Sequence, residues 1–308
     1  MKLKNYGVQS CCAYFDKSRQ GYYERMHNHI KDMQYKQMVL QQVKRIRAEL
    51  PQCGTRKLQY LLQSAGIPIG RDRLFKLLGE ENLLIKRKRK FTSTTDSKHT
   101  YMTYANLLKE IEVNHAEEVF VSDITYIRTD AGFCYLAIIA DGYSKKIMGK
   151  YLSKSIQTTL VLKALVAALR NKQYNRSLMH HSDQGCQYCS RTYVNALKLS
   201  DIMISMAGKG KAWENPVAER MIGILKQEFG LDQTFGNYAE ANEAVDVAIN
   251  KYNRLRPHSS CGYLTPQQAH EKGKNLDNLW KKKLSTYSQK ERKEAKERKN
   301  TTTTVKYI

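Results

Sequence analysis

Residues 119–127 read VFVSDITYI, and this stretch decides the fold class of the chain. Apolar and β-branched residues dominate it, which is typical of a buried β-strand. Asp123 stands in its middle, where a charge is costly unless a partner compensates it. The stretch therefore predicts a strand that carries a functional carboxylate.

The segments around this strand predict a mixed sheet. Four further strands are expected: GFCYLAIIAD (132–141), KKIMGKYLS (145–153), RSLMHHS (176–182) and MISM (203–206). Residues 156–171 and 191–201 have helical periodicity instead. Three hairpin-linked strands followed by alternating helices and strands predict an α/β fold. We expect a five-stranded mixed sheet with helices on both faces, which is the order of the ribonuclease-H-like architecture.

Two more acids stand in settings that suit a metal site. Asp183 ends the fourth strand, and ligands collect at the carboxyl ends of such strands. Glu219 follows Asn215-Pro216, a favourable N-cap and first residue of a helix. A buried ion pair could explain any one of these acids, but it explains all three poorly. Carboxylates that converge from separate elements repel one another unless a cation is present, so they predict a divalent-metal site.

The charge of the chain points to a polyanionic partner. The net charge is +23, and residues 1–100 hold 21 Lys+Arg against 8 Asp+Glu, a net of +13. Residues 280–308 hold 10 against 3, a net of +7, which leaves +3 for residues 101–279. A nearly neutral centre between basic flanks suits DNA held from both sides. The substrate of the metal site is then a phosphodiester, for which two Mg²⁺ ions about 3.5–4 Å apart can neutralise the attacking and leaving oxygens.

The first ninety residues predict two helix-turn-helix-like units. Residues 7–26 read as two short helices around Asp16–Ser18, the second of which presents Arg19. TRKLQYLLQS and RDRLFKLLGEENLLI form the second pair, with Arg71, Arg73 and Lys76 on a polar face. An ordinary helical hairpin with a solvated basic face is the alternative for either pair. The run Lys86, Arg87, Lys88, Arg89 and Lys90 then leads into a Ser/Thr-rich linker, and it serves either as a phosphate contact or as a solubilising segment.

These segments predict four parts. They are a helical DNA-binding region (1–90), a linker (91–115), a catalytic core (116–273) and a basic tail (274–308) that is disordered without a partner. Seven scattered cysteines indicate reduced thiols, and neither a signal peptide nor an apolar run of 18 residues is present. We therefore expect a cytoplasmic protein without a membrane span.

Five stretches together resemble the DDE transposases of bacterial insertion sequences. They are SDITYI, GFCYLAIIAD, HHSDQGCQY, NPVAERMIGILKQE and YNRLRPHSSCGYLTP. More narrowly, they resemble the integrase-core product of the second reading frame (OrfB type), in the retroviral-integrase superfamily. The resemblance runs from about residue 7 to residue 273.

The resemblance implies a function for the whole chain. Asp123, Asp183 and Glu219 are implied as catalytic metal ligands, with Mg²⁺ as the cofactor and Mn²⁺ as a substitute. The implied activity is cleavage and transfer of DNA strands at terminal inverted repeats and at target DNA. The implied partners are further copies in a synaptic complex, at the bacterial nucleoid, and a helix-turn-helix protein from the first frame.

The family also carries a basic residue seven positions after the glutamate, which is Lys226 here. Seven residues are nearly two helical turns, so Lys226 shares a face with Glu219 and can reach the DNA backbone. It could instead be an ordinary exposed lysine. Lys209 and Lys211 lie on a glycine-containing loop before that helix and are further candidate DNA contacts.

Departures from the family pattern leave the acids intact. Cys186 stands where serine is usual, and Trp213-Glu214 replaces a Tyr-Asp pair. Asp141 also ends a strand, and we interpret it as structural, with a place near the metal as the alternative.

Other classes fit the sequence less well. Cys186 and Cys189 with nearby histidines suggest zinc only weakly, because a second pair at ligand spacing is missing. No histidine has an arginine three positions later, as a tyrosine recombinase would, and no phosphate-binding G-x-x-x-x-G-K-[ST] loop occurs. The serious competitor is an inactive DNA-binding protein or relic that recognises element ends without chemistry. The intact set of three acids argues against it.

Overall fold

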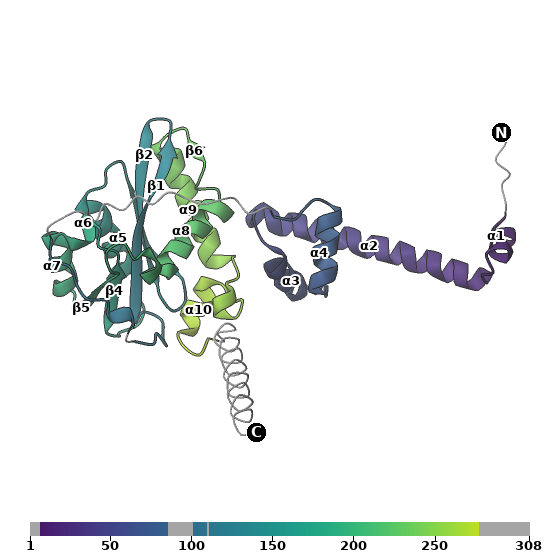
Figure 1. The fold of residues 1–308 in the computed structure, drawn as a ribbon, viewed down its shortest axis with the longest axis horizontal. Helices are drawn as coiled ribbons and strands as arrows, with labels where there is room; N and C mark the ends of the chain where they lie inside the picture. Colours follow the sequence, from purple (N-terminus) through teal and green to yellow (C-terminus); the bar gives the residue numbers. More distant parts are fainter. Residues whose placement is uncertain (1–6, 86–100, 110, 277–308) are drawn as a thin grey trace, which may run out of the picture. The chain divides into compact units, whose positions relative to one another are not determined.

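The chain forms two units, a helical one up to Lys86 and a second one from Arg87 that is built on a sheet (Figure 1). The computed structural model describes residues 7–85, 101–109 and 111–276. The run Lys86–Lys90, the first part of the expected linker and nearly all of the basic tail lie outside the described residues.

The helical unit differs from its prediction at its first pair of helices. α1 (Val8–Tyr14) is short, as expected, but α2 (Arg19–Glu49) continues for 31 residues, so the prediction of a short second helix is wrong. Ser18 caps α2 by accepting a hydrogen bond from the Gly21 N–H at 3.0 Å. No proline follows until Pro51, and the intervening residues are mostly good helix formers, so nothing stops the helix earlier.

The second pair is present as predicted. α3 (Thr55–Ser64) and α4 (Arg71–Glu80) are ten residues each and are joined by a short turn. Leu74, Leu77 and Leu78 are buried, as their helical spacing predicts. The helical unit therefore has its own small apolar core, to which α2 adds Val39 and Val43.

The second unit contains the expected mixed sheet. Its strands are β1 (Val119–Thr129), β2 (Gly132–Asp141), β3 (Ile147–Ser153), β4 (Leu178–Ser182), β5 (Ile202–Met206) and β6 (Thr234–Phe235). The order is β3-β2-β1-β4-β5, with antiparallel pairs among the first three and parallel pairs from β1 to β5. This is the ribonuclease-H-like order. β6 is a sixth strand, too short for its sequence to predict, and it pairs with the end of β1.

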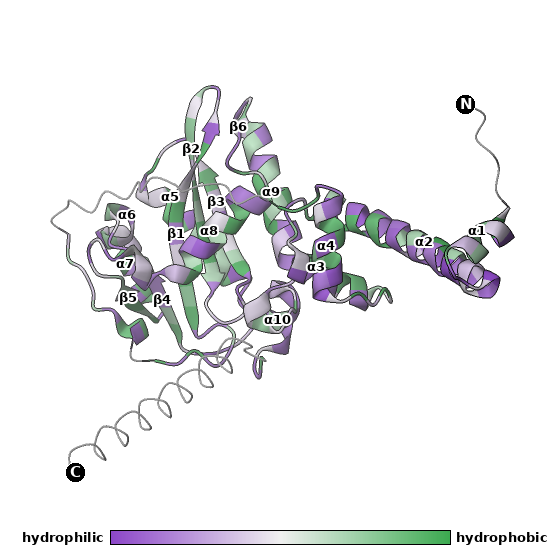
Figure 2. Ribbon diagram, turned by 45° about the vertical axis from the view of Figure 1, so that its right-hand side comes forward, coloured by the Kyte–Doolittle hydropathy of each residue, from purple (hydrophilic) through white to green (hydrophobic). Residues whose placement is uncertain are grey.

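Helices cover both faces of the sheet, as predicted (Figure 1). One face carries α5 (Thr158–Arg170), α6 (Cys186–Cys189) and α7 (Arg191–Leu199), and the other carries α8 (Pro216–Glu228) and α9 (Tyr238–Arg254). Short 3-10 turns lie at Leu107–Lys109, Ala212–Glu214 and Ser259–Cys261, and α10 (Pro266–Lys272) ends the described chain. The strands are apolar along most of their length, whereas the helices have a polar side (Figure 2). The sheet therefore separates two apolar cores and holds β1 at its centre.

The packed core begins earlier than the sequence boundary at residue 116. The Met206 N–H donates to the Ala105 carbonyl at 3.2 Å, and the Leu107 N–H donates to Ser205 Oγ at 3.0 Å. Leu107, Leu108 and Val113 pack on the core beside α8. These apolar residues give the second half of the predicted linker a surface to bury.

The sequence predicts no membrane span, and the length and apolar character of the helices bear on this prediction. None of those in the described ranges combines the length and the apolar character that crossing a bilayer requires.

Candidate active site

β1 places Asp123 beside an open stretch of the sheet. β2 pairs with β1 from Phe120 to Thr129. On the other edge, β4 pairs only with residues 119–121 of β1 and β6 only with residues 128–129. Within the described chain, the edge between those two pairings has no strand partner. Asp123 lies in this interval and lines a cavity.

The register of the sheet sets Asp183 beside Asp123. Val121 is the parallel partner of His181, and two more residues along each strand lead to Asp123 and Asp183. Neighbouring strands lie about 4.8 Å apart, so the two carboxyl groups are close. β4 ends at Ser182, and Asp183 Oδ1 then accepts a hydrogen bond from the Gly185 N–H at 3.0 Å. The turn that stops the strand thus also orients the second acid.

The pKa of the Asp123 carboxyl group reflects the closeness of the other acids. Burial raises the pKa of its carboxyl group, and the charges of Asp183 and Glu219 raise it further, to about 8. The Ile124 N–H, which donates to Asp123 Oδ1 at 2.8 Å, and the charge of Lys226 oppose this rise in pKa. Without a cation, the site therefore resists full ionisation.

α8 carries Glu219 in its first turn. Asn215 is the N-cap residue and Pro216 opens the helix, as predicted, but the Asn215 side chain makes no cap hydrogen bond. Instead, Asn215 Nδ2 donates to the Ser122 carbonyl at 3.0 Å, next to Asp123. This bond ties the start of α8 to β1 and thereby positions Glu219. Glu219 itself is exposed, and partial burial of its carboxyl group raises its pKa.

The donor set of these acids fits Mg²⁺, because all donors are hard oxygen atoms and their repulsion would be relieved by a cation. Asp123 and Asp183 line one cavity of about 640 Å³, whereas Glu219 is not part of its lining. Among the described residues, no three His, Cys, Asp or Glu side chains are grouped closely enough to hold a metal ion. The fold thus brings the two aspartates together and leaves the glutamate on the adjacent helix.

Lys226 is not an ordinary exposed lysine. Its side chain is 7% exposed, and its Nζ lies 4.0 Å from the centroid of the Tyr126 ring. Burial lowers the pKa of this ammonium group. The sequence predicted that Lys226 faces the DNA with Glu219, whereas the structure places its charge against an aromatic residue of β1.

The loop with Lys209 and Lys211 is held by Glu214, one of the departures from the family pattern. The Glu214 carboxylate pairs with Lys109 at 2.6 Å and accepts from the Asn106 side chain and the Gly208 N–H. The Lys109 ammonium leads these groups in lowering the pKa of Glu214 to about 2. Lys209 and Lys211 remain exposed on this loop, where they can reach a ligand.

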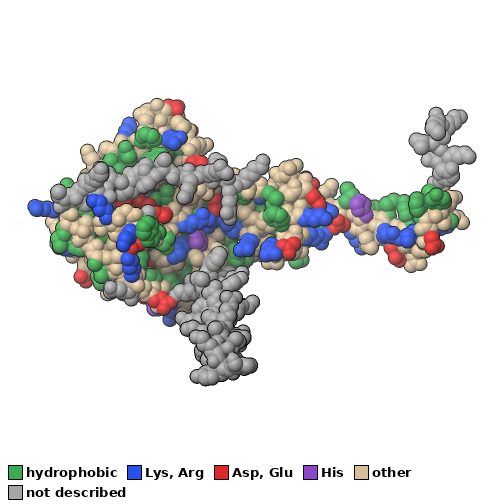
Figure 3. All heavy atoms as spheres, viewed as in Figure 1, with side chains coloured by type: hydrophobic (Ala, Val, Ile, Leu, Met, Phe, Trp, Pro, Cys, Tyr) green, Lys and Arg blue, Asp and Glu red, His purple; other side chains and the backbone are tan. Residues whose placement is uncertain are grey.

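The candidate DNA contacts of α4 are partly paired with acids of their own unit. Arg73 pairs with Asp32 and lies over the Tyr35 ring at 5.0 Å. Arg71 pairs with Asp72 at 2.8 Å, and Lys76 lies 3.9 Å from Glu80. Figure 3 shows acidic and basic side chains interspersed along this unit. The basic side chains of α4 nevertheless keep more than half of their surface exposed, and Arg19 is exposed at the start of α2.

Asp141 has structural partners. It is buried, and its carboxylate accepts from the Glu117 N–H and from the Ser144 N–H and hydroxyl groups. Its strand partner is Phe120, so it lies toward the opposite end of β1 from the open edge. These contacts support the structural interpretation.

The cysteines and histidines near Asp183 have other partners than a zinc ion. The Cys189 thiol faces the Met206 sulfur at 3.7 Å, and burial raises its pKa to about 11. His180 pairs with the Tyr193 hydroxyl at 2.9 Å, and His181 with Ser205 Oγ at 2.9 Å. They hold the two strands and the helices around Asp183.

Several residues that line the cavity together with the two aspartates were not predicted from the sequence. Its lining includes Tyr126, Arg128, Phe133, Tyr135 and Ile156. Strand alternation after Asp123 could have placed Tyr126 and Arg128 on one face, but not the approach of residue 156 from another segment.

Comparison with known proteins identifies the core. The integrase core domain family matches residues 113–212, and a second integrase core domain model matches residues 200–266. The chain is 37% identical over 266 residues to the insertion element IS600 uncharacterized 31 kDa protein of Shigella sonnei, covering 85% of this chain and 97% of that protein. It is 31% identical over 225 residues to the transposase InsF for insertion sequence IS3A of Escherichia coli K12, covering 71% of this chain and 77% of that protein.

Solved structures with a similar core come from viral integrases. The HTLV-2 integrase catalytic core domain in complex with magnesium superimposes with a TM-score of 0.41 at 18% identity, covering 50% of this chain and 96% of that one. A chain in the structure of the simian T-cell lymphotropic virus intasome in complex with the PP2A regulatory subunit B56 gamma gives a TM-score of 0.43 at 18% identity. That match covers 71% of this chain and 70% of the other.

Proposed function

Because the chain belongs to the insertion-sequence transposases with an integrase core domain, we propose that it binds the terminal inverted repeats of an insertion sequence and catalyses metal-dependent cleavage and transfer of DNA strands. The observation that carries this proposal is the placement of Asp123 and Asp183 side by side at the open edge of β1, in one cavity. Glu219 lies within electrostatic range on α8. A pair of crowded acids with a third nearby is suited to divalent cations in contact with phosphate.

In the proposed mechanism, Asp123, Asp183 and Glu219 would hold two Mg²⁺ ions, for which Mn²⁺ would be a substitute. When bound, these ions supply charge neutralisation at the attacking and leaving oxygens of a phosphodiester. The β1–β4 register holds the two aspartates, and the bond from Asn215 to the Ser122 carbonyl holds the start of α8. No side chain has to act as a nucleophile. Water attacks the phosphodiester at the element end, and the P–O3′ bond breaks to leave a 3′-hydroxyl and a 5′-phosphate. That 3′-hydroxyl then attacks a second phosphodiester, whose own 3′ oxygen leaves as a hydroxyl group.

The basic residues supply DNA binding in this proposal. Lys209 and Lys211 contact the backbone near the reacting phosphate, while Arg19, Arg71, Arg73, Lys76 and Lys86–Lys90 bind the repeat or its phosphates. Chemistry at two element ends requires two active sites. The working form is therefore a complex of two or more copies, which a first-frame helix-turn-helix protein can join.

The test is an assay of strand cleavage and joining on an element-end oligonucleotide with Mg²⁺. Asp183→Asn should lower the cleavage rate by about 10³-fold or more, since one carboxylate of the set is lost. Asp201→Asn is the matched control, because Asp201 is exposed and its φ of 54° is one that Asn adopts readily. If wild type and Asp183→Asn are equally inactive while both bind the repeat, the chain is a DNA-binding relic instead.

A further inference from the structure

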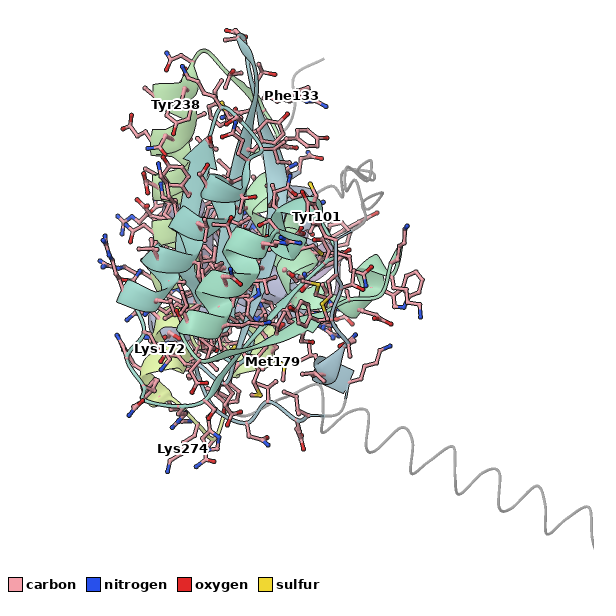
Figure 4. All side chains as sticks on the ribbon, turned by 90° about the vertical axis from the view of Figure 1, so that its left-hand side faces the viewer. Tyr101, Phe133, Lys172, Met179, Tyr238 and Lys274 are labelled. Carbon is pink, nitrogen blue, oxygen red and sulfur yellow. The ribbon has the colours of Figure 1, made fainter. Side chains whose placement is uncertain are left out.

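The cavity lined by Asp123 and Asp183 also has aromatic lining residues. Tyr126, Phe133 and Tyr135 line it, all from the β1–β2 hairpin, and Ile156 lines it from the segment before α5. Phe133 is 55% exposed and Ile156 is 42% exposed. Phe133 lies high on the hairpin (Figure 4). The lining therefore combines two acids with exposed apolar side chains.

The aromatic wall is held in place from two sides. The Phe133 ring meets the Tyr126 ring edge-on, with centroids 5.3 Å apart and an interplanar angle of 76°. The buried Lys226 ammonium lies over the Tyr126 ring. Both contacts are favourable for aromatic rings and fix their orientation. The rings therefore form a surface prepared before any ligand arrives.

The rim of the cavity carries polar groups. Gln187 Nε2 donates to the Ile156 carbonyl at 3.0 Å, which joins α6 to the segment across the opening. Arg128 lines the cavity near Phe133, its strand partner. A planar apolar ligand with a neighbouring negative charge would match the rings and the guanidinium together.

We propose that this cavity receives an unstacked nucleobase from the DNA strand whose phosphodiester lies at Asp123 and Asp183. The inference rests on the proposed function and adds a recognition step to it. A base next to the reacting phosphate is within one nucleotide of the carboxylates, but it can enter a pocket only after it leaves the helical stack. Stacking on aromatic side chains tolerates every base, so the site would accept different sequences. The base comes either from the element end or from the target DNA.

The experiment compares Phe133→Ala with wild type on three substrates. They are fully paired DNA, an element end with mismatched pairs at the cleavage point, and a target with mismatched pairs at the joining point. On paired DNA, Phe133→Ala should react at least about tenfold more slowly, because stacking no longer offsets the cost of unpairing. A mismatch should bring its rate to within about threefold of wild type, since the base is already free. Rescue by a mismatched end assigns the base to the element, and rescue by a mismatched target assigns it to the target.

Two further variants separate stacking from a general structural effect. Phe133→Trp should retain the wild-type rate on paired DNA, because it preserves an aromatic surface. Leu199→Ala removes an exposed apolar side chain of α7 that does not line the cavity, and it should match wild type on every substrate.

Each other outcome overturns the inference. If Phe133→Ala lowers the reaction rate equally on paired and mismatched DNA, or does not lower it at all, base capture is contradicted. The proposed function still stands in that case, provided that wild type cleaves and Asp183→Asn does not. If the wild-type protein is inactive on every substrate, both base capture and the proposed function are contradicted.

Discussion

The buried carboxyl group of Asp123 lowers the stability of the folded protein at neutral pH. Its pKa is raised from 3.8 to about 8 in the folded, metal-free protein. Between these two values, the folded state holds a proton that the unfolded state has released. The free energy of unfolding therefore falls as the pH rises from about 4 to about 8, and it changes no further from this group above that range.

Asp123→Asn should abolish this fall in the free energy of unfolding, because asparagine does not ionise. In EDTA at pH 8 the variant should be more stable than wild type by on the order of 2 kcal/mol, and the difference should vanish near pH 4. Urea unfolding across this pH range measures it, with Asp201→Asn as the control. Mg²⁺ should stabilise wild type more than Asp123→Asn. A variant that is less stable than wild type at pH 8 would mean that the carboxylate is not under repulsion.

Lys226 illustrates the limit of a residue pattern. The spacing of seven positions after Glu219 predicts a shared helical face and a DNA contact. It does not predict that the ammonium lies over Tyr126, because that contact joins α8 to a residue one hundred positions earlier in the sequence. In the structure, Lys226 packs on one ring of the aromatic wall.

At the scale of elements, α5 shows how closely the layers of the core approach. An ideal Cβ on Gly149 of β3 would lie 2.2 Å from the Ala164 carbonyl oxygen and 2.5 Å from the Ala168 nitrogen. Both partners are backbone atoms, which cannot rotate away. Glycine at position 149 therefore allows α5 to lie directly on the sheet.

Gly149→Ala should lower the free energy of unfolding by about 1–3 kcal/mol, because α5 must move off β3. Gly223→Ala is the matched change inside α8, where nothing lies within 4 Å of the added Cβ. It should raise stability by roughly 0.5–1 kcal/mol, since alanine favours the helix. Thermal melting of both variants distinguishes them, and equal melting temperatures would refute the close approach.

Much of the element pattern was predictable from sequence. Strands such as VFVSDITYI and helices such as 191–201 have clear periodicity and lie where they were expected. The Asp16–Ser18 turn separates α1 from α2 as predicted, but the predicted second helix is too short, because no sequence signal ends α2 before Leu50. The sequence places Asp123 inside one strand and Asp183 at the end of another, whereas the hydrogen bond from Asn215 to β1 depends on three-dimensional packing.

At the scale of the whole molecule, charge and chemistry occupy different parts of the chain. Residues 101–279 carry a net charge of only +3, so affinity for DNA should come from the basic flanks. The core contributes the acids, the cavity and its aromatic wall. In the proposed function, this division would let a site of crowded carboxylates act on a polyanion, because the basic flanks would hold the DNA and bound cations would accept the phosphate.

In the proposed function, metal ions held by these acids act on the phosphodiester itself. The most direct measurement uses element-end DNA in which the bridging 3′ oxygen at the cleavage point is replaced by sulfur. Sulfur binds Mn²⁺ more readily than Mg²⁺. The account predicts that wild-type protein cleaves the sulfur substrate at least about tenfold faster in Mn²⁺ than in Mg²⁺, while unmodified DNA shows no such preference. Equal rates in the two metals on the sulfur substrate, or undiminished cleavage of normal DNA in EDTA, would contradict it.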